Sequence, residues 1–285
     1  MITTGCASES SSPVASTLFV SDYQASAIVQ YDGATGAFER VFAAGSVQRV
    51  DRPARVRLGP AGALFSAGFG RSDIVRYAVT SGEMMDIFYW DTGLLEEPVQ
   101  LRFDGDDLIV LGNDTANAVV ISPDGVARRS FGNPVMRAAH DFAIGAERQL
   151  YVATDSHPQL GSAVQVWDLA TGALLRHFGT IDEVATATSV ALDHDGVLYV
   201  ADGDLDRVVR FDPGTGALLD VFAAGFSRPI SIDFGPDGAF YVLDAIGLHG
   251  FDATGARLGQ LIAVGDGHLL RPRSFTFVAD VALAP

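Results

Sequence analysis

Short apolar stretches recur along the chain at nearly constant spacing. They are Leu18-Phe19-Val20, Leu64-Phe65-Ser66, Leu108-Ile109-Val110, Leu150-Tyr151-Val152, Leu198-Tyr199-Val200 and Phe240-Tyr241-Val242. Their first residues lie 46, 44, 42, 48 and 42 positions apart. Around each stretch, short segments of alternating apolar and polar residues are separated by turns rich in Asp, Gly and Pro, which is typical of β-strands joined by tight turns. A repeat of this length predicts a β-propeller with one blade per unit.

The fifth unit shows the expected parts of a blade. Its four strands, A to D from the centre outward, are predicted at 189–192, 197–201, 207–211 and 217–222. The connections at 193–196 and 212–216 contain the Asp and Gly residues that tight turns require, since Gly adopts a positive φ and the short Asp side chain binds its own turn backbone. Many of the acidic residues of the chain are therefore explained by the turns that they form.

The two ends of the chain predict how the ring closes. The chain begins its first unit at a strand B (17–20), and no strand A precedes it. Residues 271–277 match 228–234, the strand A region of the sixth unit. We therefore predict an all-β, six-bladed β-propeller of four-stranded antiparallel blades, closed by a C-terminal strand that completes blade 1. Residues 1–16 form a flexible Ser-rich lead, and 17–285 form the propeller.

Composition narrows the range of partners. The net charge is −16, and all 19 basic residues are arginine. An acidic chain is a poor candidate for binding nucleic acid, because phosphate neutralisation needs a basic face. The absence of lysine excludes Schiff-base catalysis. No apolar run approaches the roughly 20 residues of a transmembrane segment.

The single cysteine, Cys6, lies in the sequence Thr3-Thr4-Gly5-Cys6 before a Ser-rich run at 8–12. This resembles the junction of a bacterial lipoprotein, which implies a lipid anchor on Cys6 and a location in the bacterial periplasm, on the cell surface or outside the cell. Thr3 stands where such junctions usually carry an apolar residue, and no basic and apolar leader precedes it. The alternative is a frayed terminus with an incidental thiol.

One stretch carries a family resemblance. Residues 198–212, Leu-Tyr-Val-Ala-Asp-Gly-Asp-Leu-Asp-Arg-Val-Val-Arg-Phe-Asp, resemble an NHL repeat. The Tyr/Phe-Asp-x-x-Thr-Gly-Ala-Phe/Leu pattern within 28–43 and 208–223 resembles bacterial extracellular propellers of the same group, with gluconolactonase-like and peptidylglycine amidating-lyase-like propellers more distant. The resemblance implies the fold. It does not fix the function, because these families include scaffolds, lactone hydrolases and lyases.

Ligand-binding candidates lie at the starts of the predicted inner strands, which should converge on the central channel. These positions are Ala54-Arg55, Val99-Gln100, His140-Asp141, Thr188-Ser189, Ile230-Ser231 and Arg273-Ser274, with Arg57, Arg102 and Asp233 two residues further along. We interpret Arg55, Arg57, Gln100, Arg102, His140, Asp141 and Arg273 as a binding site for a small anion, because guanidinium groups bind carboxylates in bidentate fashion. The alternative is that the arginines pair with Asp141 and Asp233 to satisfy an inner polar ring.

Catalytic and metal-binding patterns are weak. Of the six histidines only His140 lies at a strand A start, no pair has metal-ligand spacing, and there is no Gly-x-Ser-x-Gly motif. The series Asp22, Asp155, Asp202 and Asp244 after strand B is interpreted as a repeated turn residue. We assign no catalytic residue and no metal ligand, although the many aspartates leave room for one oxygen-ligated Ca²⁺ or other divalent cation.

Two irregular segments are candidate partner contacts, because loops on a rigid scaffold often carry binding specificity. They are 155–162 with His157 and Gln159, and 89–97 with Tyr89 and Trp90, which we expect to be exposed. The sequence thus favours an exported binding or scaffold propeller for a protein or a small anionic ligand, without assigning an enzyme. The alternative is a metal-dependent lactone hydrolase or lyase with its site at the channel mouth.

Overall fold

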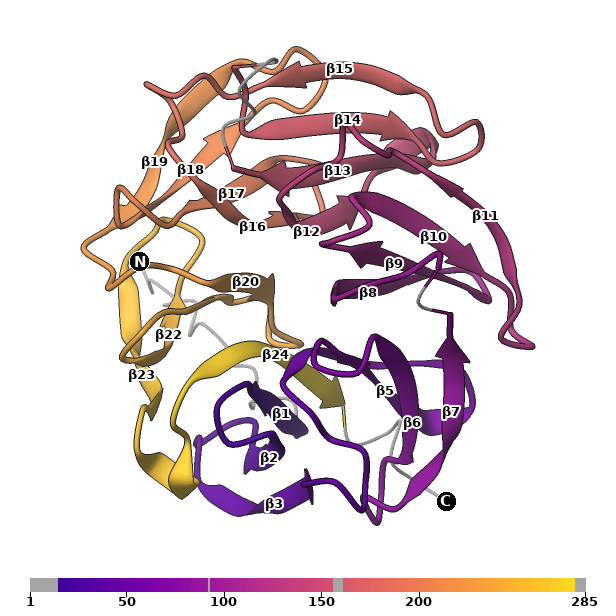
Figure 1. The fold of residues 1–285 in the computed structure, drawn as a ribbon. Helices are drawn as coiled ribbons and strands as arrows, with labels where there is room; N and C mark the ends of the chain where they lie inside the picture. The colour runs from indigo at the N-terminus through magenta and orange to yellow at the C-terminus, as the bar shows by residue number, and fades with distance from the viewer. Residues whose placement is uncertain (1–14, 92, 156–160, 280–285) are drawn as a thin grey trace, which may run out of the picture.

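The computed structural model of the protein describes residues 15–91, 93–155 and 161–279. Its strands form six four-stranded antiparallel sheets arranged as blades around a central axis (Figure 1). In each blade the strands follow the order expected from the sequence, from an inner strand A to an outer strand D. The predicted six-bladed β-propeller is confirmed.

The blades have the following strands. Blade 1 contains β24 (Pro272–Ala279), β1 (Ser16–Asp22), β2 (Ala27–Asp32) and β3 (Phe38–Ala44). Blade 2 contains β4 (Pro53–Leu58), β5 (Ala63–Gly68), β6 (Asp73–Ala78) and β7 (Met84–Trp90). Blade 3 contains β8 (Pro98–Asp104), β9 (Asp107–Gly112), β10 (Asn117–Ile121) and β11 (Ala127–Phe131). Blade 4 contains β12 (Ala139–Ile144), β13 (Gln149–Thr154), β14 (Val164–Asp168) and β15 (Leu174–Phe178). Blade 5 contains β16 (Ala187–Leu192), β17 (Leu198–Asp202), β18 (Arg207–Phe211) and β19 (Leu218–Ala224). Blade 6 contains β20 (Ser231–Phe234), β21 (Phe240–Leu243), β22 (Gly247–Phe251) and β23 (Arg257–Ala263).

Within the described residues, helical structure is limited to short 3₁₀ turns. These are η1 (Pro60–Gly62), η2 (Ala146–Arg148) and η3 (Asp266–His268). Across 15–91, 93–155 and 161–279, no helix is long and apolar enough to cross a membrane.

The hydrophobic core lies between the blades. One buried cluster joins Tyr151 and Val166 of blade 4 to Val190 and Val200 of blade 5, and comparable clusters of described residues lie at the other five blade interfaces. Burying one large apolar side chain contributes about 1.5–3 kcal/mol. Because every cluster draws on two blades, no blade can bury its faces alone.

The connections between strands C and D explain the repeated Asp and Gly residues. The Asp32 carboxylate accepts hydrogen bonds from the amides of Ala34 (3.1 Å) and Thr35 (2.7 Å). The Thr35 hydroxyl and amide donate to this carboxylate and lower the pKa of Asp32. Gly36 has φ +70°, and a side chain there would collide with the carbonyl of Leu261 in blade 6. The turn therefore requires Asp and Gly for its own geometry and for contact with the neighbouring blade.

The arginines of the outer strands also hold neighbouring blades together. Arg40 donates to the carbonyl of Thr80 in blade 2 (2.7 Å), and its guanidinium lies 5.3 Å from the ring centre of Phe42. Arg129 of blade 3 donates to Ala170 of blade 4 in the same way. Guanidinium groups suit this position because they combine several donors with a flat face that stacks on aromatic rings.

The ring closes where the C-terminal strand β24 pairs with β1, as predicted. The carboxylate of Asp22, at the end of β1 and fully buried, accepts hydrogen bonds from the amides of Ala25, Leu270 and Arg271. Asp22 therefore fixes the segment that leads into β24. Asp202 and Asp244 bind the segments that lead into β16 and β20 in the same manner.

The structure corrects one member of the predicted aspartate series. The sequence groups Asp155 with Asp22, Asp202 and Asp244, but Thr154 occupies the equivalent register position in blade 4, opposite Ala139. Asp155 lies one residue later, and its carboxylate is directed at His140 (2.8 Å).

Replacing Asp22 by Ala should weaken ring closure strongly. The change leaves two buried or half-buried amides of the segment before β24 without an acceptor, and hydrogen bonds to a charged group contribute about 1.5–3 kcal/mol each. We expect the free energy of unfolding, measured by urea denaturation, to fall by roughly 2–4 kcal/mol. Asp32→Ala, in an exposed turn of the same blade, is the control and should cost about 1 kcal/mol or less. Equal losses in the two variants would contradict the closure role.

Candidate functional site

Each inner strand directs side chains into the central channel in successive layers. In β24, β4, β8, β12 and β16 a β-bulge inserts one extra residue just after the start of the strand. The extra residues are Arg273, Ala54, Val99, His140 and Thr188, and Ile230 lies in the corresponding place before β20. All six line one pocket at the start of the inner strands. A bulge re-aims side chains locally, which explains why adjacent residues both face the channel.

The next layer is a closed polar network centred on Asp141. The Asp141 carboxylate is fully buried and accepts hydrogen bonds from Arg55 Nη2 (2.8 Å), the Phe142 amide (2.7 Å), the Gln100 side-chain amide and the Ser189 hydroxyl. Arg55 Nη1 also donates to the Ser231 hydroxyl (2.8 Å). Buried charges need this degree of pairing. The network fills the middle of the channel and separates its two ends.

A third layer lies at the far end of the inner strands. Arg57 Nη2 contacts Asp233 at 2.6 Å, and Arg102 Nη1 lies 3.7 Å from the same carboxylate. Burial raises the pKa of Asp233, but the charges of Arg57, Arg102 and Arg55 outweigh that effect and lower it overall. Burial lowers the pKa of Arg57.

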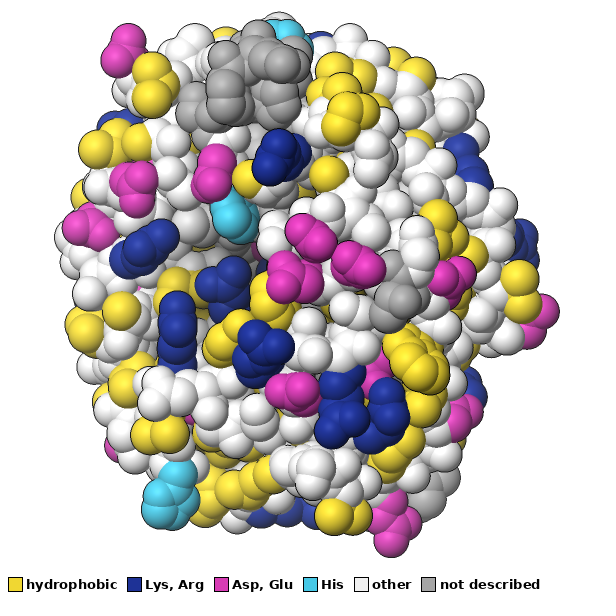
Figure 2. Space-filling model, viewed as in Figure 1, with side chains coloured by type: hydrophobic (Ala, Val, Ile, Leu, Met, Phe, Trp, Pro, Cys, Tyr) yellow, Lys and Arg dark blue, Asp and Glu magenta, His cyan; other side chains and the backbone are white. Residues whose placement is uncertain are grey.

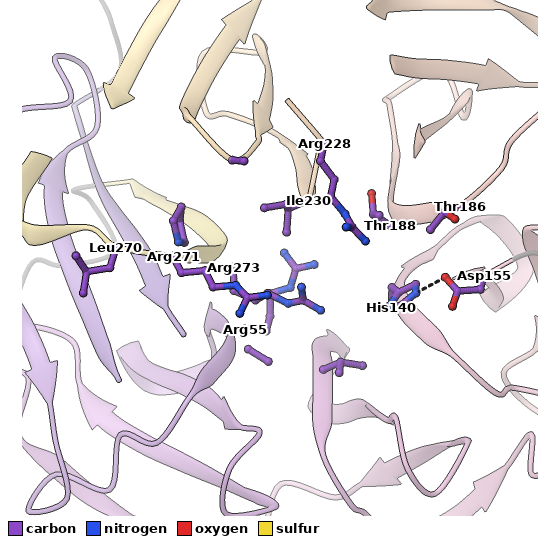
Figure 3. A pocket seen from close by; sticks show the side chains of 14 residues that line it. Arg55, His140, Asp155, Thr186, Thr188, Arg228, Ile230, Leu270, Arg271 and Arg273 are labelled. Atoms are coloured by element: carbon purple, nitrogen blue, oxygen red, sulfur yellow. Dashed lines mark hydrogen bonds and ion pairs between the residues drawn. The ribbon is translucent and has the colours of Figure 1, made fainter. Parts of the chain in front are cut away.

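The pocket at the start of the inner strands, which we call the mouth pocket, has a volume of about 420 Å³. Its lining includes Arg55, Arg228, Arg271, Arg273 and His140. Figure 3 shows the guanidinium groups of Arg55, Arg273 and Arg228 reaching into it from different blades. The same face of the molecule shows basic side chains and a histidine gathered near its centre (Figure 2). The mouth pocket is thus basic in a protein with a net charge of −16.

Three of these arginines make no hydrogen bond or ion pair with a carboxylate of the described residues, although the charge of Arg228 acts on Asp155 at longer range. Among the residues that the structure describes, no side-chain hydrogen bond or ion pair neutralises Arg228, Arg271 or Arg273. Arg271 instead lies over the Tyr23 ring at 5.6 Å. Burial, followed by the positive charge of Arg271 and then that of Arg55, lowers the pKa of Arg273. The folded protein therefore holds a like-charge cluster that an anion would stabilise.

His140 and Asp155 form a pair on another side of the mouth pocket. His140 Nε2 lies 2.8 Å from Asp155 Oδ1, and both side chains are accessible to solvent. The hydrogen bond from His140 lowers the pKa of Asp155. The carboxylate therefore orients the imidazole ring at the pocket wall.

The structure distributes the predicted anion-binding residues over three places. His140 and Arg273 line the mouth pocket with one face of Arg55. Gln100 and Asp141 are fully buried in the middle network, so they do not face the pocket. Arg57 and Arg102 lie at the far end with Asp233. The alternative interpretation, an inner ring of paired charges, describes Arg55, Arg57 and Asp141.

Sequence analysis did not identify Arg228 and Arg271 as site residues. Each precedes a proline at the start of its blade, in Arg228-Pro229 and Arg271-Pro272. The repeated dipeptide is part of the match between residues 228–234 and 271–277 that predicts ring closure. Arg228 has a positive φ of 56°, and both arginines line the mouth pocket at the start of their blades. The repeated Arg-Pro dipeptide is the sequence feature that could have identified Arg228 and Arg271 as site residues.

The irregular segments are placed as follows. Trp90 is 63% exposed, but Tyr89 is buried, so the expected exposure of Tyr89 is wrong. Both belong to β7, whose alternation turns adjacent residues to opposite faces. His157, Gln159 and Cys6 lie outside the described residues. The partner-contact role of Trp90 stays a prediction.

No metal centre is visible in the described part of the chain, where no three His, Cys, Asp or Glu side chains come together in a metal-binding arrangement.

Comparison with known proteins supports the fold alone. No protein-family model and no curated protein sequence matches the chain. A protein of unknown function from Bacteroides caccae is 14% identical and has a TM-score of 0.73, covering 93% of this chain and 99% of that one. A chain in the nidogen/laminin complex is 14% identical with a TM-score of 0.70, covering 92% and 97%. Virginiamycin B lyase from Staphylococcus aureus is 12% identical with a TM-score of 0.64, covering 85% and 79%.

Stability measurements should distinguish charges that are paired within the fold, such as Asp141, from charges without a partner, such as Arg273. Asp141→Ala leaves Arg55 buried without its partner, which typically costs about 3–5 kcal/mol. Arg273→Ala removes an unpaired, half-buried charge beside like charges, and we expect the free energy of unfolding to stay within about 0.5 kcal/mol or to increase. Both are measured by urea denaturation at neutral pH. A large loss of stability in Arg273→Ala would show that Arg273 has a structural role.

Proposed function

We propose that this protein is a binding propeller that captures a small organic dianion, of the dicarboxylate class, in the mouth pocket. The observation that carries the proposal is the set of three arginines, Arg228, Arg271 and Arg273, without carboxylate partners among the described residues. Arginine clusters without internal partners are suited to carboxylates, which they bind through paired, charge-assisted hydrogen bonds.

The charge of the pocket favours a dianion. Arg55, Arg228, Arg271 and Arg273 contribute four positive charges, and Asp141 and Asp155 remove two, which leaves two when His140 is neutral. The volume of about 420 Å³ lies within the range of small-molecule sites. Thr186 and Thr188 add hydroxyl groups to the wall, so a hydroxy acid would find further hydrogen-bond partners.

Calorimetric titration with malate tests this proposal. We expect malate to bind the wild-type protein, and Arg228→Ala combined with Arg273→Ala to weaken binding by at least about a hundredfold, because two charge-assisted interactions are lost. Arg128→Ala is the control, since Arg128 is an exposed arginine that pairs with Asp107 outside the pocket. Lactate, with one carboxylate, should bind more weakly. Equal binding of malate to the double variant and the wild type would overturn the proposal.

A lyase or hydrolase is the second candidate, favoured by the His140–Asp155 pair on the pocket wall. An imidazole oriented by a carboxylate can act as a general base. The virginiamycin B lyase neighbour shows that an enzyme can use this fold. Incubation with a sugar lactone, followed by chromatography, distinguishes the candidates. Turnover that His140→Ala abolishes, together with a stoichiometric divalent cation in elemental analysis, would favour the enzyme.

We further propose that the chain is an NHL-type propeller exported by a bacterium and anchored through Cys6. The motif at residues 198–212 and the Thr-Thr-Gly-Cys sequence support this assignment. In a bacterial host, labelled palmitate should be incorporated into the wild-type protein and not into Cys6→Ser. Equal labelling of the two proteins, or none in either, would contradict the anchor.

A further inference from the structure

The far end of the channel contains a second pocket of about 330 Å³. It shares no lining residue with the mouth pocket, and the Asp141 network lies between them. We call it the far pocket. Its charged floor consists of Arg57, Arg102 and Asp233, and its wall includes Leu58, Phe103, Ile144 and Leu192.

The floor of the far pocket carries one unbalanced positive charge. Arg57 is fully engaged, because Nη2 pairs with Asp233 (2.6 Å) and Nη1 donates to the Phe275 carbonyl (3.0 Å). Arg102 makes one hydrogen bond, from Nε to the Phe142 carbonyl (2.7 Å). Arg102 Nη1 is 3.7 Å from Asp233, which is too long for a hydrogen bond, and its Nη2 has no partner among the described residues. Two arginines and one aspartate leave a net charge of +1.

The wall of the far pocket has a different character from that of the mouth pocket. Each of Leu58, Phe103, Ile144 and Leu192 directly follows a channel-facing residue of its inner strand and is partly exposed. Four large apolar side chains from four adjacent blades thus surround a cationic floor. In the mouth pocket, by contrast, arginines from three blades and threonines occupy much of the lining.

We propose that the far pocket binds a monocarboxylate with an apolar body, such as a medium-chain fatty acid. The carboxylate pairs with Arg102 Nη1 and neutralises the single excess charge, and the hydrocarbon lies against the apolar wall. Asp233 disfavours a ligand that carries a second carboxylate, because its own negative charge lies beside Arg102 and repels further negative charge. Burial of the hydrocarbon supplies affinity, and the paired hydrogen bonds orient the head group. This inference is independent of the ligand proposed for the mouth pocket.

Titration with octanoate tests the far pocket. We expect octanoate to bind the wild-type protein, and octanol, which lacks the charge, to bind at least about tenfold more weakly. Arg102→Ala should weaken octanoate binding by about tenfold or more for the same reason. Arg148→Ala is the matched control, because Arg148 is an exposed arginine in η2, near the end of β12, that already pairs with Asp104. It should bind octanoate as the wild type does.

A second variant covers the case in which Arg102→Ala disturbs the channel. Leu192→Glu places a negative charge on the partly exposed wall and should abolish octanoate binding. Because Leu192 also packs against the core between blades 4 and 5, thermal unfolding of this variant is measured to show that it is folded at the titration temperature. Arg273→Ala, in the mouth pocket, should leave octanoate binding unchanged, so failure of the mouth-pocket proposal remains distinguishable. Octanoate affinity that is unchanged in both Arg102→Ala and Leu192→Glu, or lost in Arg273→Ala, would overturn the inference.

Discussion

The channel is organised by one buried carboxylate. Asp141 of blade 4 accepts hydrogen bonds from Arg55 of blade 2, Gln100 of blade 3 and Ser189 of blade 5. Arg55 extends the network to Ser231 of blade 6. Five blades are thereby connected across the axis by groups that have left water and must satisfy one another. Because this network occupies the middle of the channel, it also divides the channel into two pockets with different chemistry.

The arginines differ in whether their terminal nitrogens have hydrogen-bond partners within the protein. Where a guanidinium connects blades, both of its terminal nitrogens have partners, as for Arg40 on the outer strands and Arg55 in the channel. At the mouth pocket the donors of Arg228 and Arg273 lack such partners among the described residues. Unpaired like charges destabilise a fold. A protein that retains them is therefore less stable than it would be without them. The anion binding proposed above would offset that cost.

The fold was predictable because the repeat imposes the same local rules six times. The apolar triplets, the Asp and Gly turns and the match between 228–234 and 271–277 each identify one part of a blade. The convergence of the inner strands on the channel was also predictable. The depth at which each side chain lies in the channel was not predictable. A β-bulge changes the direction of one residue without a clear sequence signal. Arg55 and Arg57 therefore look equivalent in sequence, although they face opposite ends of the channel.

The bulges of the inner strands have a consequence for how this protein can change. The extra residue lines the mouth pocket, but Ala54 and Val99 are also buried, and Val99 packs in the core between blades 3 and 4. In this chain the six positions hold Ala54, Val99, His140, Thr188, Ile230 and Arg273, which include apolar, hydroxyl, imidazole and guanidinium side chains. Each of the six blades thus contributes one such position to the lining of the mouth pocket, so a substitution in a single blade changes the pocket.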